Sequence, residues 1–166
     1  MVPRLFCCLN SPLQDLPDKM LEMPRHPKRR GEWVELQFMA RAASYGLKLC
    51  KLWGDTAPYD VTVEHGTGFH RVQVKSTMHL RAKHWWACQL TNCGYKLDDF
   101  DYLAVYIIPK DVWYIIPWVT IAGRTGIHFD SRRPQGKYRQ YREAWHLLTG
   151  KPKQTGSRQL VQTRLA

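Results

Sequence analysis

Residues 59–76, YDVTVEHGTGFHRVQVKS, decide the fold because they predict a β-hairpin with a defined register. Two alternating apolar runs flank Gly66-Thr67, and glycine at the first position of a two-residue loop is typical of a type II′ turn. Counting outward from this loop places Asp60 directly opposite Gln73. Because successive side chains of a strand alternate between faces, Asp60, Gln73 and Lys75 are expected on one face of the hairpin.

This shared face predicts metal-dependent hydrolysis. A hard cation such as Mg²⁺ prefers oxygen ligands and keeps several waters. Asp60 offers a carboxylate, Gln73 a side-chain carbonyl and Val74 a main-chain carbonyl. Lys75 is suited to hold or deprotonate an attacking water and to offset developing negative charge.

A helix is expected before the hairpin, over Gly31–Tyr45, because apolar residues recur at helical spacing and Gly46 follows as a stop. Glu32 and Glu35 lie three apart on this helix, so both can face the same side and supply a further carboxylate. A short strand is expected over Leu47–Trp53.

Downstream of the hairpin, β-branched and aromatic runs predict a strand at 84–90 and a second hairpin from 101–108 and 112–118. Residues 123–136 are expected to be irregular. Tyr138–Leu148 carries apolar residues at helical spacing and predicts a short amphipathic helix. This element order predicts a single α/β (α+β) domain.

The basic charge is concentrated at the two ends of the chain. The sequence holds 25 Lys and Arg against 14 Asp and Glu, for a net charge of +11. The excess lies before residue 31 and after residue 130, around a balanced middle. Basic flanks favour a polyanionic partner, because each cation that meets a phosphate releases counterions. A solvated tail that only aids solubility is the alternative interpretation.

Three segments follow from this organisation: an irregular, proline-rich leader over 1–27, a folded domain over 28–150 and a basic, disordered tail over 151–166. The longest apolar stretches are far shorter than the roughly 20 residues of a membrane-spanning helix, so no membrane partner is expected. The odd set of five cysteines has no CxxC pair, which favours free thiols in a reducing, prokaryotic cytoplasm over zinc or disulfides.

The residues Gly31-Glu32-Trp33-Val34-Glu35 on a helix, then Pro58-Tyr59-Asp60, then Gln73-Val74-Lys75 after one hairpin, resemble the PD-(D/E)xK nuclease superfamily. Gln in place of the usual Asp or Glu is most similar to the branch of group I intron-associated homing endonucleases. The resemblance covers roughly residues 28–118. It implies a restriction-endonuclease-like αβββαβ core with a central mixed sheet, and Mg²⁺-dependent (or Mn²⁺-dependent) hydrolysis of DNA phosphodiesters.

By this resemblance Asp60 is the metal ligand, Gln73 occupies the second motif position, Lys75 is the catalytic lysine and Glu35 is the helix-borne acid. Glu32 is a weaker candidate for the last place. Gln73 removes one negative charge from the metal site, which predicts weaker cation binding than in an Asp or Glu version. Duplex cleavage needs two active sites, so a homodimer or homotetramer is expected.

The remaining basic residues are assigned to DNA rather than to catalysis. The expected DNA-backbone contacts are Lys28, Arg29, Arg30, Arg132, Arg133, Lys137, Arg139 and Arg142. His79, His84 and the acids of 98–101 are expected to be surface or turn residues, and most tryptophans to be core. Two other functions stay open: a nucleic-acid-binding module with a decayed nuclease site, and a structural or assembly protein.

Overall fold

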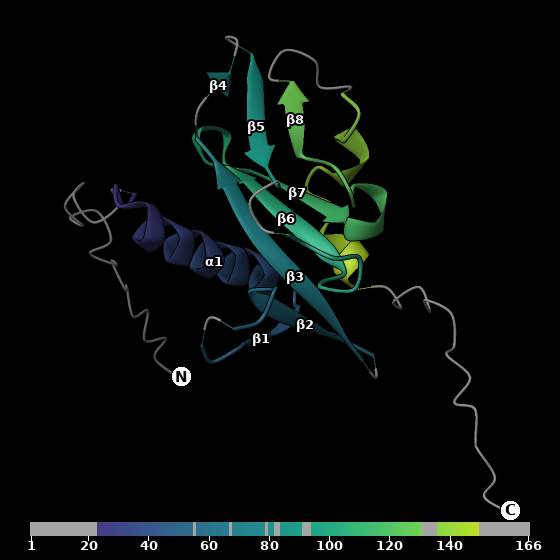
Figure 1. The fold of residues 1–166 in the computed structure, drawn as a ribbon. Helices are drawn as coiled ribbons and strands as arrows, with labels where there is room; N and C mark the ends of the chain where they lie inside the picture. The colour runs from purple at the N-terminus through teal and green to yellow at the C-terminus, as the bar shows by residue number, and fades with distance from the viewer. Residues whose placement is uncertain are drawn as a thin grey trace, which may run out of the picture.

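A computed structural model describes residues 23–54, 56–66, 68–78, 80–81, 84–90, 94–130 and 136–149 (Figure 1). Most of the expected leader and all of the expected basic tail lie outside these residues. So do Arg132, Arg133 and His79. No helix in the described ranges is long and apolar enough to cross a membrane.

One long helix and eight strands make up the regular structure of the described residues. They are α1 (Pro27–Ser44), β1 (Lys48–Lys51), β2 (Val61–His65), β3 (Gly68–Thr77), β4 (Leu80–Arg81), β5 (Trp85–Gln89), β6 (Tyr102–Ile107), β7 (Val112–Pro117) and β8 (Gly126–Asp130). Short 3-10 turns lie at η2 (Ile108–Lys110), η3 (Trp118–Thr120), η4 (Arg139–Tyr141) and η5 (Trp145–Leu148).

The strands form two sheets. The larger has the order β1-β2-β3-β6-β7, and it is mixed because β3 and β6 run parallel while the other neighbours are antiparallel. The smaller has the order β4-β5-β8. The predicted register of the first hairpin is confirmed, since Val61 pairs with Val72 and His65 with Gly68. Gly66, the first residue of the loop between these strands, has a φ of +55°, as a type II′ turn requires.

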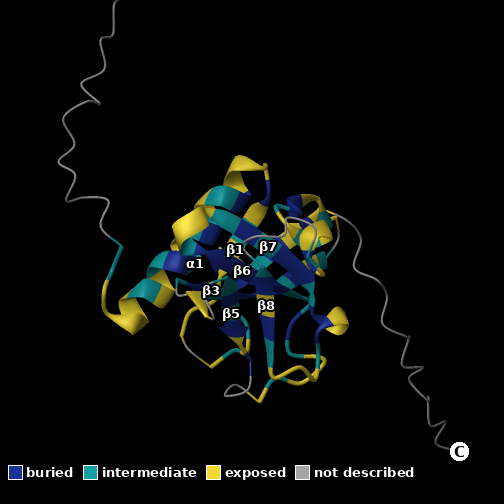
Figure 2. Ribbon diagram, turned by 90° about the horizontal axis from the view of Figure 1, so that it is seen from above, coloured by how far each residue is buried: buried dark blue, intermediate teal, exposed yellow. Residues whose placement is uncertain are grey.

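The larger sheet is covered on both faces. On one face α1 buries Val34, Phe38 and Ala42, which lie four apart on a single helical stripe. They pack with Val72 and Val74, which alternate with Gln73 and Lys75 along β3 and so point to the other face. The opposite face packs against the small sheet through a second cluster that includes Leu103, Val105, Ile127 and Phe129. Figure 2 shows the buried residues between these layers and exposed residues along the outer side of α1.

The second hairpin, of β6 and β7, forms as expected, and β5 forms within the expected strand 84–90. Two expectations further along the chain are wrong. The supposedly irregular segment 123–136 contains β8, which pairs with β5 and buries Ile127 and Phe129. A five-residue run with only two apolar residues on one face gives a weak sequence signal, and its partner strand lies far away in the chain.

Tyr138–Leu148 does not form the predicted amphipathic helix. The segment is broken into η4 and η5 by Glu143, which has a positive φ of +49°. The Glu143 carboxylate accepts hydrogen bonds from the Trp113 N–H at 2.7 Å and from Trp145 Nε1 at 2.8 Å. The hydrogen bond with Trp113 joins the segment to β7 at the point where the helix is interrupted, while Trp145 and Leu148 are still buried.

The connection between β3 and β6 also differs from the αβββαβ pattern that the resemblance implied. In its described residues this connection holds β4 and β5 and no helix. The predicted fold class is nonetheless correct, because one helix and a central mixed sheet form a single α+β domain.

Candidate active site

Asp60 immediately precedes β2, and it forms hydrogen bonds with the backbone of β3. Its N–H donates to the carbonyl of Val72 at 3.0 Å, which extends the hairpin by one hydrogen bond. Its Oδ2 then accepts the N–H of Val74 at 2.7 Å. The carboxylate therefore bonds the backbone of β3 just beyond the pair of Val61 and Val72, where the pairing of β2 with β3 stops.

Gln73 shares this carboxylate, as the predicted register requires. Its Nε2 donates to Asp60 Oδ2 at 2.7 Å and lies 3.4 Å from the carbonyl oxygen of Val74. The Gln73 residue is only 6% exposed. The structure thus brings three of the predicted site residues into one hydrogen-bonded cluster, with the amide nitrogen rather than the amide oxygen facing Asp60.

The acid expected from the helix reaches the same cluster. Glu35 lies on α1, and its side chain is 20% exposed. Its carboxylate pairs with Lys51 Nζ at 2.5 Å, across from the end of β1. Glu35, Lys51 and Asp60 all line one open pocket of about 390 Å³, together with Glu32 and Lys28.

The electrostatics of Asp60 show which charges surround it. Its pKa is raised from 3.8 to about 6, mainly by burial and in smaller part by the nearby Glu35 carboxylate, against a lowering by the hydrogen bond from the Val74 N–H. Lys75 and Lys51 also lower this pKa, so both ammonium groups act on the carboxylate. A buried acid surrounded by one further acid and two bases is the kind of perturbed group found at functional sites.

Lys75 lies on β3 two residues beyond Gln73, as the predicted alternation requires. Its Nζ is 5.4 Å from the centroid of the Tyr95 ring. Tyr95 follows β5 and stacks edge-on against Phe100. The aromatic face therefore holds the ammonium at the side of the strand on which the cluster lies.

Lys51 was not among the residues predicted for the site. The sequence does contain a signal for Lys51. The alternation of apolar and polar residues around Leu49 predicts an apolar side chain at position 51, and a lysine stands there instead. It lies opposite Val61 in the β1–β2 pairing, next to Asp60. Pairing with Glu35 raises the pKa of Lys51, with a further contribution from Asp60.

The predicted DNA contacts fall into two groups. Lys28 lines the pocket of Asp60, and Arg29 and Arg30 follow in the first turn of α1. Lys137, Arg139 and Arg142 belong instead to the last described segment, where they line two other pockets. The pocket of Asp60 shares no lining residue with either of them.

The contacts also show what the remaining acids and aromatic residues do. The Asp101 carboxylate accepts hydrogen bonds from the Arg71 guanidinium at 3.0 Å and from the Arg71 N–H at 2.7 Å, which ties it to β3. The tryptophans Trp86, Trp113 and Trp118 are buried, as expected. Among the residues described, no group of three or more His, Cys, Asp or Glu is placed to hold a metal ion.

The comparisons with known proteins identify the family of the chain. The chain belongs to the PD-(D/E)XK endonuclease family, whose model matches residues 25–148. It is similar to the bacterial homing endonuclease I-Ssp6803I, with 27% sequence identity and a TM-score of 0.63 over 73% of this chain and 91% of that one. These matches confirm the resemblance drawn from the motif.

A second solved structure is less similar. The Holliday junction resolvase Hjc of the archaeal hyperthermophile Archaeoglobus fulgidus has 14% identity and a TM-score of 0.43, over 62% of this chain and 85% of that one. The search of curated proteins gave no match.

Proposed function

We propose that this protein is a Mg²⁺-dependent DNA endonuclease whose active site is the pocket between α1, β1 and the start of β2. The observation that carries the proposal is the Asp60 carboxylate, held by the Val74 N–H and the Gln73 amide and facing the charges of Glu35 and Lys75. Membership in an endonuclease family and similarity to a homing endonuclease support it.

The donor set of the pocket fits a hard divalent cation. Asp60 and Glu35 provide carboxylates, and the Val74 carbonyl oxygen lies within the same cluster. These are the oxygen ligands that Mg²⁺ and Mn²⁺ prefer. Gln73 would complete the set only with its amide turned to present Oε1, because its Nε2 faces Asp60 in the structure. A cation held there supplies positive charge that polarises the phosphate and activates water.

The side chains of the chain itself then have distinct roles. Asp60 and Glu35 would hold the cation with their carboxylates, which a hydrogen bond and an ion pair respectively keep in place. Lys75 positions the attacking water and offsets the negative charge that develops on the phosphate oxygens. Water forms a bond to phosphorus as the bond to the 3′-oxygen breaks, which leaves 5′-phosphate and 3′-hydroxyl ends.

DNA reaches the pocket over the basic start of α1. Lys28 lines the pocket itself, and Arg29 is exposed beside it. These cations meet backbone phosphates and so position the strand without reading its sequence. Cleavage of both strands of a duplex requires two such pockets, which a homodimer or homotetramer provides.

A supercoiled-plasmid assay tests the proposal. Purified protein with Mg²⁺ or Mn²⁺ should nick or linearise the plasmid, and EDTA or the Asp60→Asn variant should abolish the product. Glu64→Gln is a matched control, because Glu64 is an exposed acid on β2 whose ion pair with Lys48 lies outside the pocket. Binding of plasmid without any metal-dependent product would overturn the catalytic proposal and leave the decayed-site binding module.

A further inference from the structure

The pocket of Asp60 contains a positive charge supplied by the chain itself. Lys51 is the last residue of β1, and its Nζ lies 2.5 Å from Glu35 Oε2. Leu49, two residues earlier, packs against the core that α1 covers, so the alternation of the strand directs Lys51 toward the same helix. The ammonium of Lys51 therefore binds the carboxylate that is proposed to hold a divalent cation.

The same ammonium interacts with the other acids of the pocket. The pKa of Lys51 is raised mainly by its hydrogen bond to Glu35 and in smaller part by the charges of Glu35, Asp60 and Glu32, against a lowering by burial. In return, Lys51 is among the groups that lower the pKa of Asp60. One lysine side chain thus compensates part of the negative charge of three carboxylates.

The charges that line this pocket nearly balance. In the described part of the chain they belong to Lys28, Glu32, Glu35, Lys51 and Asp60. Three carboxylates therefore meet two ammonium groups, and the loss of Lys51 would double the excess of negative charge. A divalent cation that enters the pocket adds positive charge to a site where Lys51 already provides it.

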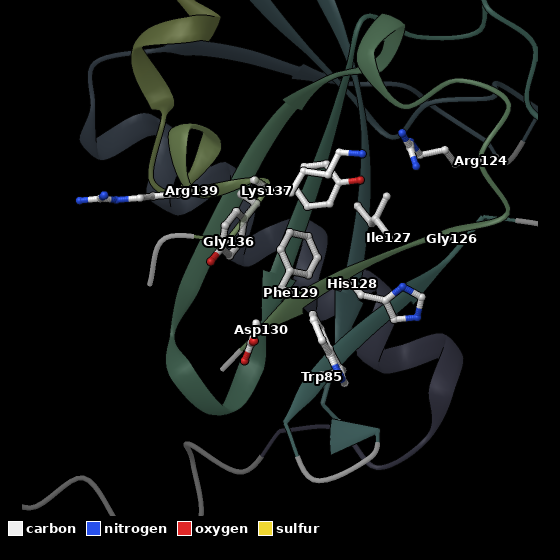
Figure 3. A pocket seen from close by; sticks show the side chains of 12 residues that line it. Trp85, Arg124, Gly126, Ile127, His128, Phe129, Asp130, Gly136, Lys137 and Arg139 are labelled. Atoms are coloured by element: carbon white, nitrogen blue, oxygen red, sulfur yellow. The ribbon is translucent and has the colours of Figure 1, made fainter. Parts of the chain in front are cut away.

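The larger pocket along β8 has the opposite character. Arg124, Lys137 and Arg139 line it, and the one carboxylate among its described lining residues is that of Asp130 (Figure 3). A divalent cation would meet repulsion there. Competition between a lysine and a metal ion is therefore expected at the pocket of Asp60 and not at this one.

We propose that Lys51 is an internal counter-ion of the site, which binds Glu35 in the metal-free protein and which the divalent cation must displace. A cation bound through either oxygen of the Glu35 carboxylate would lie beside the ammonium, and like charges repel strongly at so short a distance. Lys51 can move away, because it ends an edge strand and its side chain is 42% exposed. The inference rests on the proposed function for its metal, and it makes Lys51 the residue that sets the metal concentration required by the site.

Titration of the full chain with Mn²⁺ tests this competition without DNA and without cleavage, and the electron paramagnetic resonance signal of the free ion reports binding. Lys51→Met removes the charge and keeps the length of the side chain. It should bind Mn²⁺ about fivefold more tightly than the wild type, since the cation no longer has to break a partly exposed ion pair. Lys51→Arg keeps a cation that can pair with Glu35, so its Mn²⁺ affinity should not exceed that of the wild type.

Lys48→Met is the matched control for the loss of a charge. Lys48 lies on the same strand and also pairs with a glutamate, Glu64, but this pair lies outside the pocket. Its Mn²⁺ affinity should stay within about twofold of the wild type, because solvent and salt screen an exposed charge. Asp60→Asn identifies the site, since it should abolish this binding both alone and together with Lys51→Met.

The stabilisation that Mg²⁺ provides gives a second readout. Lys51→Met leaves Glu35 without its ion pair, so the variant should melt below the wild type in EDTA. At one fixed Mg²⁺ concentration its melting temperature should rise by more than that of the wild type, because stabilisation by a ligand grows with the ratio of its concentration to Kd. Lys51→Gln removes the charge and keeps a hydrogen-bond donor, so it provides the same comparison if Lys51→Met folds poorly.

Equal Mn²⁺ affinity in Lys51→Met and the wild type would overturn this inference, and so would an equal gain in Lys51→Met and Lys48→Met. A wild type that binds no Mn²⁺ in an Asp60-dependent way would refute both the proposed metal site and the role of Lys51. Plasmid cleavage is measured separately. A wild type that binds Mn²⁺ through Asp60 and does not cut would refute the nuclease proposal alone, and the competition of Lys51 with the metal would stand.

Discussion

Replacing Asp60 with asparagine should stabilise the metal-free protein at neutral pH, even though it removes the central group of the proposed site. Asparagine has the same shape, and its Oδ1 can accept the hydrogen bonds that Val74 N–H and Gln73 Nε2 donate to Asp60. What it lacks is a negative charge that is buried next to the Glu35 carboxylate. Active-site acids of this kind cost folding energy when no ligand compensates them.

The magnitude follows from the pKa of Asp60. It rises from 3.8 in the unfolded chain to about 6 in the folded one, mainly by burial. At about 1.4 kcal/mol for each pKa unit, the charged form costs about 3 kcal/mol at pH values well above 6. An acid whose pKa is raised in the folded state binds its proton more tightly there than in the unfolded chain. The cost of burying the charge is therefore absent below about pH 4 and grows as pH rises through about 6.

Urea unfolding in EDTA measures this difference. Asp60→Asn should exceed the wild type in unfolding free energy by up to about 3 kcal/mol at about pH 8, by about half of that at about pH 5, and by little at about pH 4. The melting temperature should shift in parallel, by roughly 4 °C for each kcal/mol. Glu64→Gln, which changes an exposed carboxylate, should stay within about 1 kcal/mol at every pH.

Two results would refute this account. A variant less stable than the wild type at about pH 8 would mean that the Asp60 charge is compensated within the folded chain. A stability gain that does not change with pH would mean that the gain has no connection with the ionisation of Asp60. Excess Mg²⁺ should raise the stability of the wild type and not that of the variant, by about 2.7 kcal/mol at a hundredfold excess over Kd.

Three further changes test other parts of the structure. Lys75→Ala should abolish plasmid cleavage while duplex affinity in EDTA falls by less than about threefold, because one phosphate contact is a small part of the binding energy; a variant that cuts at the wild-type rate would exclude Lys75 from the reaction. Phe38→Ala should lower the unfolding free energy by about 3–5 kcal/mol in urea, since the fully buried ring of Phe38 packs against two tryptophans; a loss below about 1 kcal/mol would contradict the packing. Trp53 is fully exposed between Leu52 and Gly54, which both line the pocket of Asp60. Trp53→Ala should therefore raise KM for a DNA substrate several-fold at constant kcat, because a stacking contact is lost. An unchanged KM would show that Trp53 does not contact the DNA.

Local sequence signals predicted the part of the site that lies on the first hairpin. The loop Gly66-Thr67 sets the register, and the register places Gln73 against Asp60 without any information from distant residues. The family resemblance added the mixed sheet, which local patterns do not reveal. The parallel pairing of β3 with β6 joins residues about thirty positions apart, and no turn chemistry specifies it.

Contacts between distant segments account for what the sequence did not predict. The salt bridge of Lys51 with Glu35 depends on how α1 packs over β1, which the two local patterns leave undetermined. Glu143 breaks the expected last helix because the N–H of Trp113 lies within reach of its carboxylate. For Glu143 this tertiary contact outweighs the local helical preference of its own segment.

Gln73 can donate a hydrogen bond to the buried Asp60 charge, which an ionised acid at the same position could not do. Its Nε2 donates to the Asp60 carboxylate at 2.7 Å, so the buried charge has a hydrogen-bond donor in the absence of a cation. A carboxylate at position 73 would instead place a second negative charge at that distance and force the pair to share a proton. The neutral amide therefore lowers the cost of burying the Asp60 charge in the metal-free protein. Under the proposed function, a cation that takes Gln73 as a ligand would have to break its hydrogen bond with Asp60, and the glutamine would therefore weaken the affinity of the site for metal.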